Sequence, residues 1–230
     1  MIDGVIFDKD GTLFDFRRSW GGWAETLIRS MARDAAHADE MAAAIGYDLN
    51  SGAFAPDSPV IAATAQDIAT ALVAHQPGQT VEQIEDRINA AAAMAAMIPA
   101  VPLRPLLQSL RDRGLRIGLA TNDTEGPARA HLAAHDLTDL FDFIAGYDSG
   151  HGAKPGPGMC LAFARQTGLD PARIAMVGDS LHDLHAGRGA GMVCIAVLTG
   201  IATRADLAPH ADVVLPDIGA LPLWLSERAA

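Results

Sequence analysis

The 230-residue chain has a net charge of −11, is half hydrophobic, and carries 20% charged residues. These values support a packed core of one large domain or one domain with a smaller companion, and they argue against a disordered chain. An acidic chain without a basic patch is not expected to bind nucleic acid or an anionic membrane surface. No apolar run is long enough to span a membrane, and the first residues do not resemble a signal peptide, so we expect a cytoplasmic protein.

Short apolar runs typical of strands recur along the chain, with helix-length segments between most of them. The expected strands are residues 2–7, 115–120, 141–145, 174–177, 193–197 and 213–215. The expected helices between them are residues 102–113, 125–135, 157–167 and 181–190. Several strands are continuously apolar, which indicates burial on both faces. The alternation predicts an α/β fold with a doubly wound, Rossmann-like parallel sheet.

One long segment breaks this alternation, because it contains no convincing strand and reads as helices. Six apolar residues share one face at helical spacing: Trp20, Trp23, Ala24, Leu27, Ile28 and Met31. Ser58 followed by Pro59 predicts the start of a helix over residues 60–74. Thr80 and Gln83 have the spacing of a capping box that opens a helix toward residue 97.

These elements predict two domains. We expect a core of residues 1–15 and 99–230, and an α-helical cap of residues 16–98 inserted after the first strand. Pro99 and Pro102 mark the return from the insert to the core.

Acidic, hydroxyl and lysine side chains follow the expected strands, at the edge where open parallel sheets bind ligands. They are Asp8, Asp10, Thr121, Asn122, Lys154, Asp179 and Asp183. Neighbouring carboxylates repel one another and need a cation, and a cluster of oxygen ligands suits Mg²⁺, which also binds phosphate. With the metal present, Asp8 can stay ionised and attack phosphorus. Lys154 then offsets charge, and Thr121 can hold phosphoryl oxygens.

Four motifs in register resemble those of the haloacid dehalogenase (HAD) superfamily. They are Asp8-Lys9-Asp10-Gly11-Thr12-Leu13, Thr121-Asn122, Lys154-Pro155, and Gly178-Asp179 with Asp183. The resemblance spans residues 2 to about 200, and the phosphoglycolate phosphatase-like branch is the most similar. The helical insert lies where that family places its cap.

The resemblance implies a role for each matched residue. Asp8 forms an aspartyl-phosphate, and Asp10 protonates the leaving group and then activates water. Magnesium is held by the Asp8 carboxylate, the Asp10 backbone carbonyl and Asp179. Thr121, with Asn122 beside it, binds the phosphate. Lys154 stabilises the nucleophile and the phosphate. Asp183 does not contact the substrate and instead binds the waters of the metal ion or Lys154.

The resemblance leaves several activities to compare. Asp10 favours phosphoryl transfer, since the dehalogenases lack this second acid, and the insert has no lysine for phosphonate cleavage. A sugar-phosphate mutase of the β-phosphoglucomutase type shares all four motifs and stays open. Alternatives of another class are a phosphate-accepting signalling domain, which has half this length and no cap, and a binding-only relative without turnover.

The expected partner is a small phosphorylated metabolite, with phosphoglycolate as the first substrate to test. The sequence leaves the oligomeric state open, a homodimer included.

Several residues near these motifs have no firm assignment. Lys9 occupies a position that is usually apolar in the phosphatases, and we interpret it as a tolerated variant near the cap. Arg17 and Arg18 are candidates for binding a substrate carboxylate or second phosphate. Trp20 and Trp23 are expected in the core of the cap rather than against the substrate.

Four further residues are expected to have ordinary structural roles. His182 and His185 are expected to be solvated helix residues. Cys160 and Cys194 lie in apolar surroundings and are expected to be buried thiols rather than a disulfide or metal site.

Overall fold

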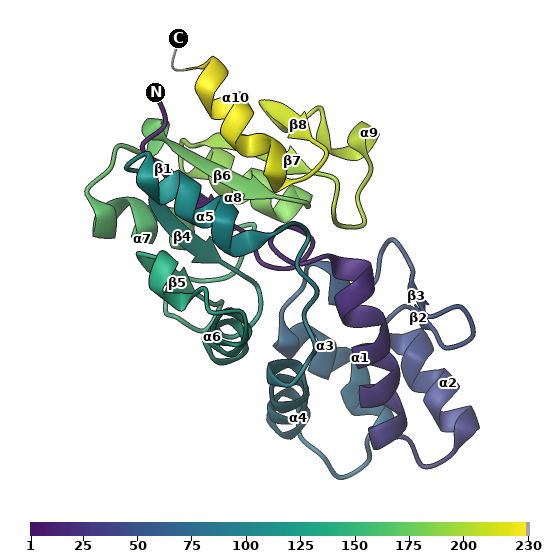
Figure 1. Ribbon diagram of the computed structural model, residues 1–230. Coiled ribbons are helices and arrows are strands. Elements are labelled where there is room, and N and C mark those ends of the chain that lie inside the picture. Colours follow the sequence, from purple (N-terminus) through teal and green to yellow (C-terminus); the bar gives the residue numbers. More distant parts are fainter. Residues whose placement is uncertain (229–230) are drawn as a thin grey trace.

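The computed structural model describes residues 1–228 and shows a six-stranded sheet between helical layers, with a helical insert beyond the carboxyl edge of the sheet (Figure 1). The strand order is β5-β4-β1-β6-β7-β8, and all neighbouring pairs are parallel. The strands are β1 (Gly4–Phe7), β4 (Arg116–Ala120), β5 (Phe143–Ala145), β6 (Ile174–Gly178), β7 (Val193–Val197) and β8 (Val213–Leu215). Phe7 at the end of β1 lies in register with Leu119 and Val177. The residues that follow β1, β4 and β6 are therefore brought together.

Helices cover both faces of the sheet, as the doubly wound prediction requires. Val5 and Phe7 belong to the cluster formed by α5 (Leu103–Asp112), α6 (Glu125–Ala134) and α10 (Leu221–Glu227). Ile6 points to the opposite side, into the cluster of α7 (Gly158–Thr167) and α8 (Leu181–Gly189). The short helix α9 (Arg204–Leu207) packs near β7. The strands are buried on both faces, which explains their continuous apolar character and confirms the predicted fold class. Both cysteines are free and buried, as predicted.

The insert consists of α1 (Phe16–Met31), α2 (Ala35–Ala44), α3 (Ala65–Leu72) and α4 (Val81–Ala93). It also contains a small antiparallel pair, β2 (Tyr47–Asp48) and β3 (Ala53–Phe54), which the sequence reasoning missed. Such two-residue strands are too short to leave a period-2 pattern. Where the insert joins the core, the outgoing and returning chains are paired, with Asp15 N donating to Ile98 O at 2.9 Å.

The predicted helix over residues 60–74 is wrong in its first part. Ser58 caps only a 3₁₀ turn, Pro59–Ile61, and the α-helix begins at Ala65 behind a capping box of Thr64 and Asp67. Between them the chain turns at Ala62 (φ −146°), and its carbonyl is directed to the core. Likewise, the helix expected to run toward residue 97 ends at Ala93.

The remaining 3₁₀ turns lie between these helices and strands. They are Val73–His75, Thr138–Leu140, Pro171–Arg173 and Ile218–Ala220. Among the described residues, no helix has both the length and the apolar character needed to cross a membrane.

Candidate active site

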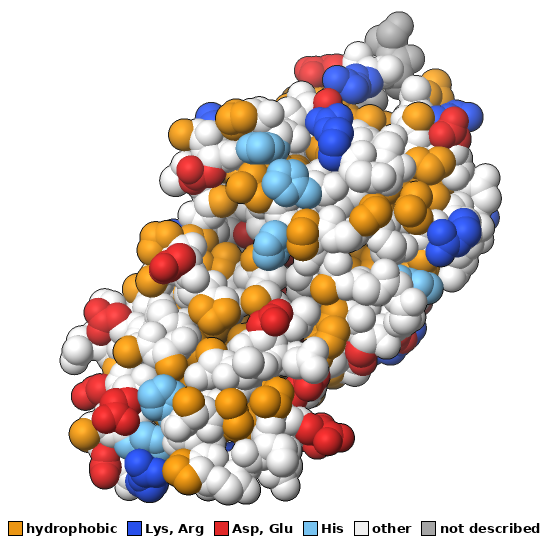
Figure 2. Space-filling model, turned by 180° about the vertical axis from the view of Figure 1, so that it is seen from behind, with side chains coloured by type: hydrophobic (Ala, Val, Ile, Leu, Met, Phe, Trp, Pro, Cys, Tyr) orange, Lys and Arg blue, Asp and Glu red, His pale blue; other side chains and the backbone are white. Residues whose placement is uncertain are grey.

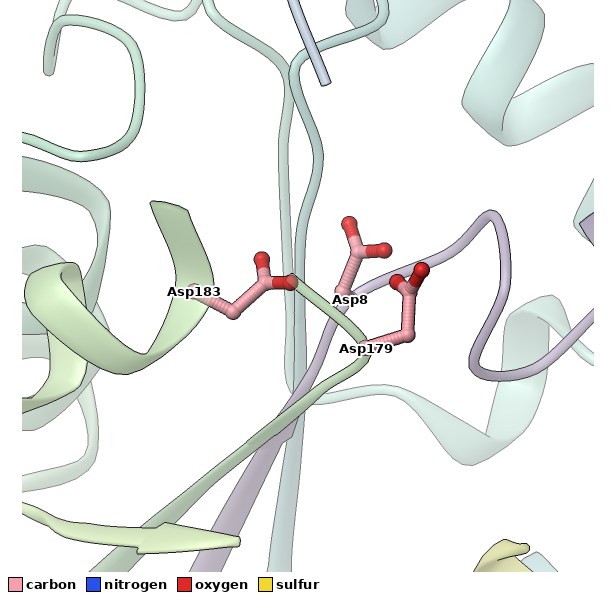
Figure 3. Close-up of side chains that lie close together, drawn as sticks. All are labelled: Asp8, Asp179 and Asp183. Carbon is pink, nitrogen blue, oxygen red and sulfur yellow. The ribbon is translucent and has the colours of Figure 1, made fainter. Parts of the chain in front are cut away.

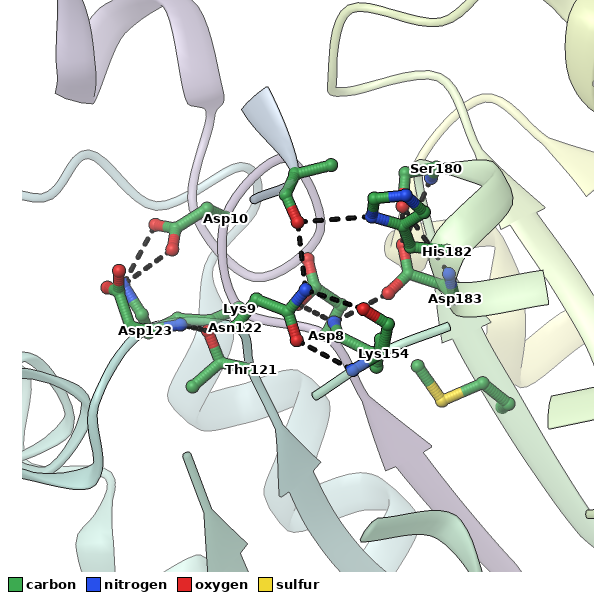
Figure 4. A network of polar contacts seen from close by, with 12 residues as sticks. Asp8, Lys9, Asp10, Thr121, Asn122, Asp123, Lys154, Ser180, His182 and Asp183 are labelled. Atoms are coloured by element: carbon green, nitrogen blue, oxygen red, sulfur yellow. Dashed lines mark hydrogen bonds and ion pairs between the residues drawn. The ribbon is translucent and has the colours of Figure 1, made fainter. Parts of the chain in front are cut away.

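The residues predicted from the motifs converge beyond the carboxyl ends of three neighbouring strands (Figure 4). Asp8 follows β1, Thr121 and Asn122 follow β4, and Asp179 follows β6. Lys154 arrives from the loop before α7, and Asp183 lies in the first turn of α8. All six line one cavity between the sheet edge and the insert.

Lys154 is the central cation of this site. Its Nζ lies 2.5 Å from Asp8 Oδ1 and 2.6 Å from Asp183 Oδ1. Burial opposes its charge, but the carboxylates of Asp183 and Asp8 outweigh that effect and raise the pKa of Lys154 above its usual value. The ammonium is thus held charged against the Asp8 carboxylate.

Two polar side chains fix this lysine and its partner. Asn122 Oδ1 accepts from the Lys154 backbone N–H at 2.8 Å, and Asn122 Nδ2 donates to the Lys154 carbonyl at 2.9 Å. Ser180 donates from its hydroxyl to Asp183 Oδ2 at 2.6 Å. Both polar ends of Asn122 are therefore engaged by the protein, so it positions the Lys154 loop rather than offering free donors to a substrate, contrary to the predicted substrate-binding role.

Three carboxylates meet beside the ammonium: Asp8, Asp179 and Asp183 each place one oxygen within 4.8 Å of the others (Figure 3). Burial raises the pKa of Asp8 to about 7 despite the nearby Lys154. Burial, with the charges of Asp183 and Asp8, raises the pKa of Asp179 well above its usual range. Three buried carboxylates beside a single ammonium group leave an excess of negative charge that a cation would neutralise. Their oxygen atoms are the kind of ligand that Mg²⁺ prefers.

The three acids differ in how many of their carboxylate oxygens already form hydrogen bonds within the protein. Both oxygens of Asp183 already accept hydrogen bonds within the protein, one from Lys154 and one from Ser180. Asp8 and Asp179 are the side chains that could hold the metal. Gly11 lies against Asp179, since a Cβ there would fall 2.4 Å from Asp179 Oδ2, and its φ of +80° also favours glycine.

Thr121 lies at the floor of the cavity and is buried. Its Oγ1 accepts from the Asp123 backbone N–H at 3.1 Å. Since this contact uses only a lone pair, the hydroxyl proton stays available to a phosphoryl oxygen.

Asp10 belongs to a second buried ion cluster, which surrounds Lys9. Lys9 Nζ lies 2.7 Å from Asp10 Oδ2, 2.8 Å from Asp123 Oδ2 and 3.1 Å from His131 Nδ1. Burial disfavours the ammonium, but Asp10 and Asp123 raise the pKa of Lys9 above its usual value. Burial and the charge of Lys9 lower the pKa of His131 to about 4, so this ring is neutral and accepts from Lys9. Lys9 is therefore the centre of a buried network, which the interpretation as a tolerated variant did not foresee.

The insert reaches this cluster through two contacts. Trp20 Nε1 donates to Asp10 Oδ1 at 2.8 Å, and His131 Nε2 donates to the carbonyl of Ala92 at 2.7 Å. Trp20 and Trp23 form an edge-to-face pair with ring centroids 4.7 Å apart, and both line the cavity. The prediction that they belong only to the core of the insert is incomplete, because they also form part of the cavity wall.

Two of the predicted substrate-binding residues do not reach the cavity. Arg17 and Arg18 lie on the first turn of α1 with exposed side chains, and neither lines the cavity. The helix turns its apolar face with Trp20 inward, so its first-turn arginines are directed to solvent. Their predicted role is not supported by this position.

The two histidines of α8 differ. His185 is exposed, as predicted. His182 is half-buried, lines the cavity and places Nδ1 3.1 Å from the Ala62 carbonyl, so the prediction that it is solvated is wrong. The contact depends on the turn at Ala62, which sequence reasoning had placed inside a helix.

A parallel sheet with an acid and lysine cluster at its carboxyl edge, closed over by a helical insert, defines an α/β enzyme with a capped active site. Residues 2–191 match the family model of haloacid dehalogenase-like hydrolases, and the chain belongs to this family, in its phosphoglycolate phosphatase-like branch.

Known proteins resemble the chain over nearly its whole length. A probable phosphatase IndB of Dickeya dadantii is 32% identical, over 93% of this chain and 88% of that protein. A phosphoglycolate phosphatase of Rhodospirillum rubrum is 30% identical, over 98% of this chain and 91% of that protein. The crystal structure of a hydrolase from Pseudomonas syringae has a TM-score of 0.72 at 21% identity and covers 99% of both chains, which shows the shared fold.

Proposed function

We propose that this enzyme hydrolyses small-molecule phosphate monoesters with Mg²⁺, through an aspartyl-phosphate on Asp8. The observation that carries the proposal is the Asp8 carboxylate, which is buried at the cavity floor, with one oxygen on Lys154 and Asp179 beside it. A carboxylate held in this way presents its other oxygen to a phosphorus atom, while Lys154 offsets the charge of the phosphoryl group.

The residues divide the chemistry between them. Asp8 Oδ forms the new bond to phosphorus while the bond to the leaving oxygen breaks, and Asp10 gives that oxygen a proton. Burial raises the pKa of Asp10 above its usual value even with Lys9 beside it, which is the direction that suits a general acid. Asp10 then takes a proton from the water that hydrolyses the aspartyl-phosphate. Asp8, Asp179 and the Asp10 backbone carbonyl would hold Mg²⁺, which supplies positive charge between the carboxylates and the phosphate.

Residues 16–98 act in this proposal as a cap domain that closes over the substrate. In the present arrangement the Ala62 carbonyl accepts from Asn122 Nδ2 at 2.8 Å and lies 3.1 Å from His182 Nδ1. Together with the contacts of Trp20 and Ala92, these bonds hold the cap against the core. Closure of this kind excludes bulk water while Asp10 is held in place.

The direct test is Asp8→Asn, assayed for phosphate release from a generic aryl phosphate with Mg²⁺. The variant should fold normally and lose at least about a thousandfold in kcat, since the amide is a far poorer nucleophile. The matched control is Asp15→Asn, which changes the N-cap of α1 outside the cavity and should keep nearly full activity. Turnover by the Asp8→Asn protein would end the proposal.

The reaction product distinguishes a phosphatase from a mutase. Release of free phosphate from phosphoglycolate or from a sugar phosphate supports hydrolysis, whereas isomerisation of a sugar phosphate without release of phosphate supports a mutase.

A further inference from the structure

The cavity has two chemically different ends. Its floor holds the acids and Lys154 described above. Its roof is formed by the cap and is almost wholly apolar, with Trp23, Val60, Ile61, Ile68, Ile88 and Ala92 among its members. No cap residue on the described cavity wall carries a charge. The leaving group of a substrate would lie against this roof, because the phosphate must face Asp8.

Among the residues that the structure describes, no Lys or Arg side chain of the cavity wall is free to pair with a second anionic group. Lys154 is paired with Asp8 and Asp183, and Lys9 lies behind Asp10 and Asp123. The wall carries five carboxylates, Asp8, Asp10, Asp123, Asp179 and Asp183, and Lys154 is its only described Lys or Arg. A carboxylate on the leaving group would therefore be desolvated near negative charge without a Lys or Arg side chain to pair with.

On the face that Figure 2 draws, hydrophobic side chains are spread over the whole molecule, and the Lys and Arg side chains in view lie toward its two ends and its right edge. Arg17 and Arg18, the nearest arginines in the sequence, do not belong to the wall.

We propose that the substrates are phosphate monoesters whose alcohol part is uncharged and largely apolar. The proposal rests on the proposed phosphatase function and narrows it. It separates this chain from an enzyme selective for phosphoglycolate, whose leaving group carries a carboxylate.

The test compares phosphoglycolate with its amide, carbamoylmethyl phosphate. The two esters have the same number of heavy atoms, and only the acid carries the extra charge. The wild-type enzyme should hydrolyse the amide with a kcat/KM at least about tenfold higher, mainly through a lower KM. A kcat/KM for phosphoglycolate equal to or above that of the amide would overturn the proposal.

One substitution in the roof examines the proposal directly. Val60→Arg should raise the ratio of kcat/KM for phosphoglycolate to kcat/KM for the amide, whereas the matched control Val60→Met should leave this ratio unchanged. An unchanged ratio in Val60→Arg would show that the leaving group does not lie against the roof.

These results are distinguishable from a failure of the phosphatase itself. If no ester releases phosphate, a generic aryl phosphate included, the proposed function fails and this inference falls with it. Release from the aryl phosphate together with a preference for the charged ester overturns the substrate class alone.

Discussion

Removal of the Lys9 ammonium is the perturbation whose size the structure defines best. Lys9→Met keeps most of the apolar stem but leaves Asp10 and Asp123 facing each other. Their oxygens are at most about 5.5 Å apart, because both lie on the same nitrogen. At an effective dielectric constant of about 20, two carboxylates at that distance repel by about 3 kcal/mol. Removal of one partner from a buried pair costs a similar amount, about 3–5 kcal/mol.

We therefore expect Lys9→Met to lower the free energy of unfolding by about 3 kcal/mol at pH 7. Urea unfolding followed by tryptophan fluorescence measures this, and Trp20 lies over the Lys9 ammonium at 5.2 Å. The double variant Lys9→Met/Asp123→Asn should recover most of the loss, because a single carboxylate then remains.

A matched control is Arg173→Met, which breaks the exposed pair with Asp3 and should cost less than about 1 kcal/mol. The reasoning is refuted if Lys9→Met unfolds within about 0.5 kcal/mol of the wild type, or if the double variant is no more stable than the single one.

Three further predictions concern metal, pH and the exposed arginines. Mg²⁺ at about 100 times its Kd should raise the free energy of unfolding by about 3 kcal/mol, and Asp179→Asn should abolish the rise; a full rise in the variant would exclude Asp179 as a ligand. The pKa of His131 is about 4 in the folded protein and about 6.5 in the unfolded chain. Between these pH values only the unfolded state binds the proton, so the free energy of unfolding decreases as the pH falls from about 6.5 to about 4. Compared with His131→Gln, the wild type should lose about 2 kcal/mol more between pH 7 and pH 5 in urea unfolding, and equal losses would contradict the buried neutral ring. Arg17→Ala and Arg18→Ala should each change KM for any hydrolysed ester by less than about twofold, whereas a tenfold rise would return them to the site.

Sequence reasoning identified the main acids and the lysine of the site because each follows a strand directly. In a parallel sheet the carboxyl ends of the strands share one edge, so Asp8, Thr121 and Asp179 must meet once β1, β4 and β6 are neighbours. Local signals also predicted the capping box at Thr80. The same reasoning missed the break at Ala62, because Ser58-Pro59 is an equally good start for a 3₁₀ turn and for an α-helix.

The sheet, the edge on which the chemistry lies and the aspartate that follows β1 can be predicted from the sequence, since they depend on local pattern and on the order of the elements along the chain. The surroundings of Asp10 depend instead on tertiary packing. Lys9 and His131 are 122 residues apart, and Trp20 reaches Asp10 from the insert. Contacts of this kind depend on how the cap packs against the core, and no spacing in the sequence encodes them. The apolar roof of the cavity was decided in the same way, because its residues come from separate helices and turns that meet only when the cap is closed.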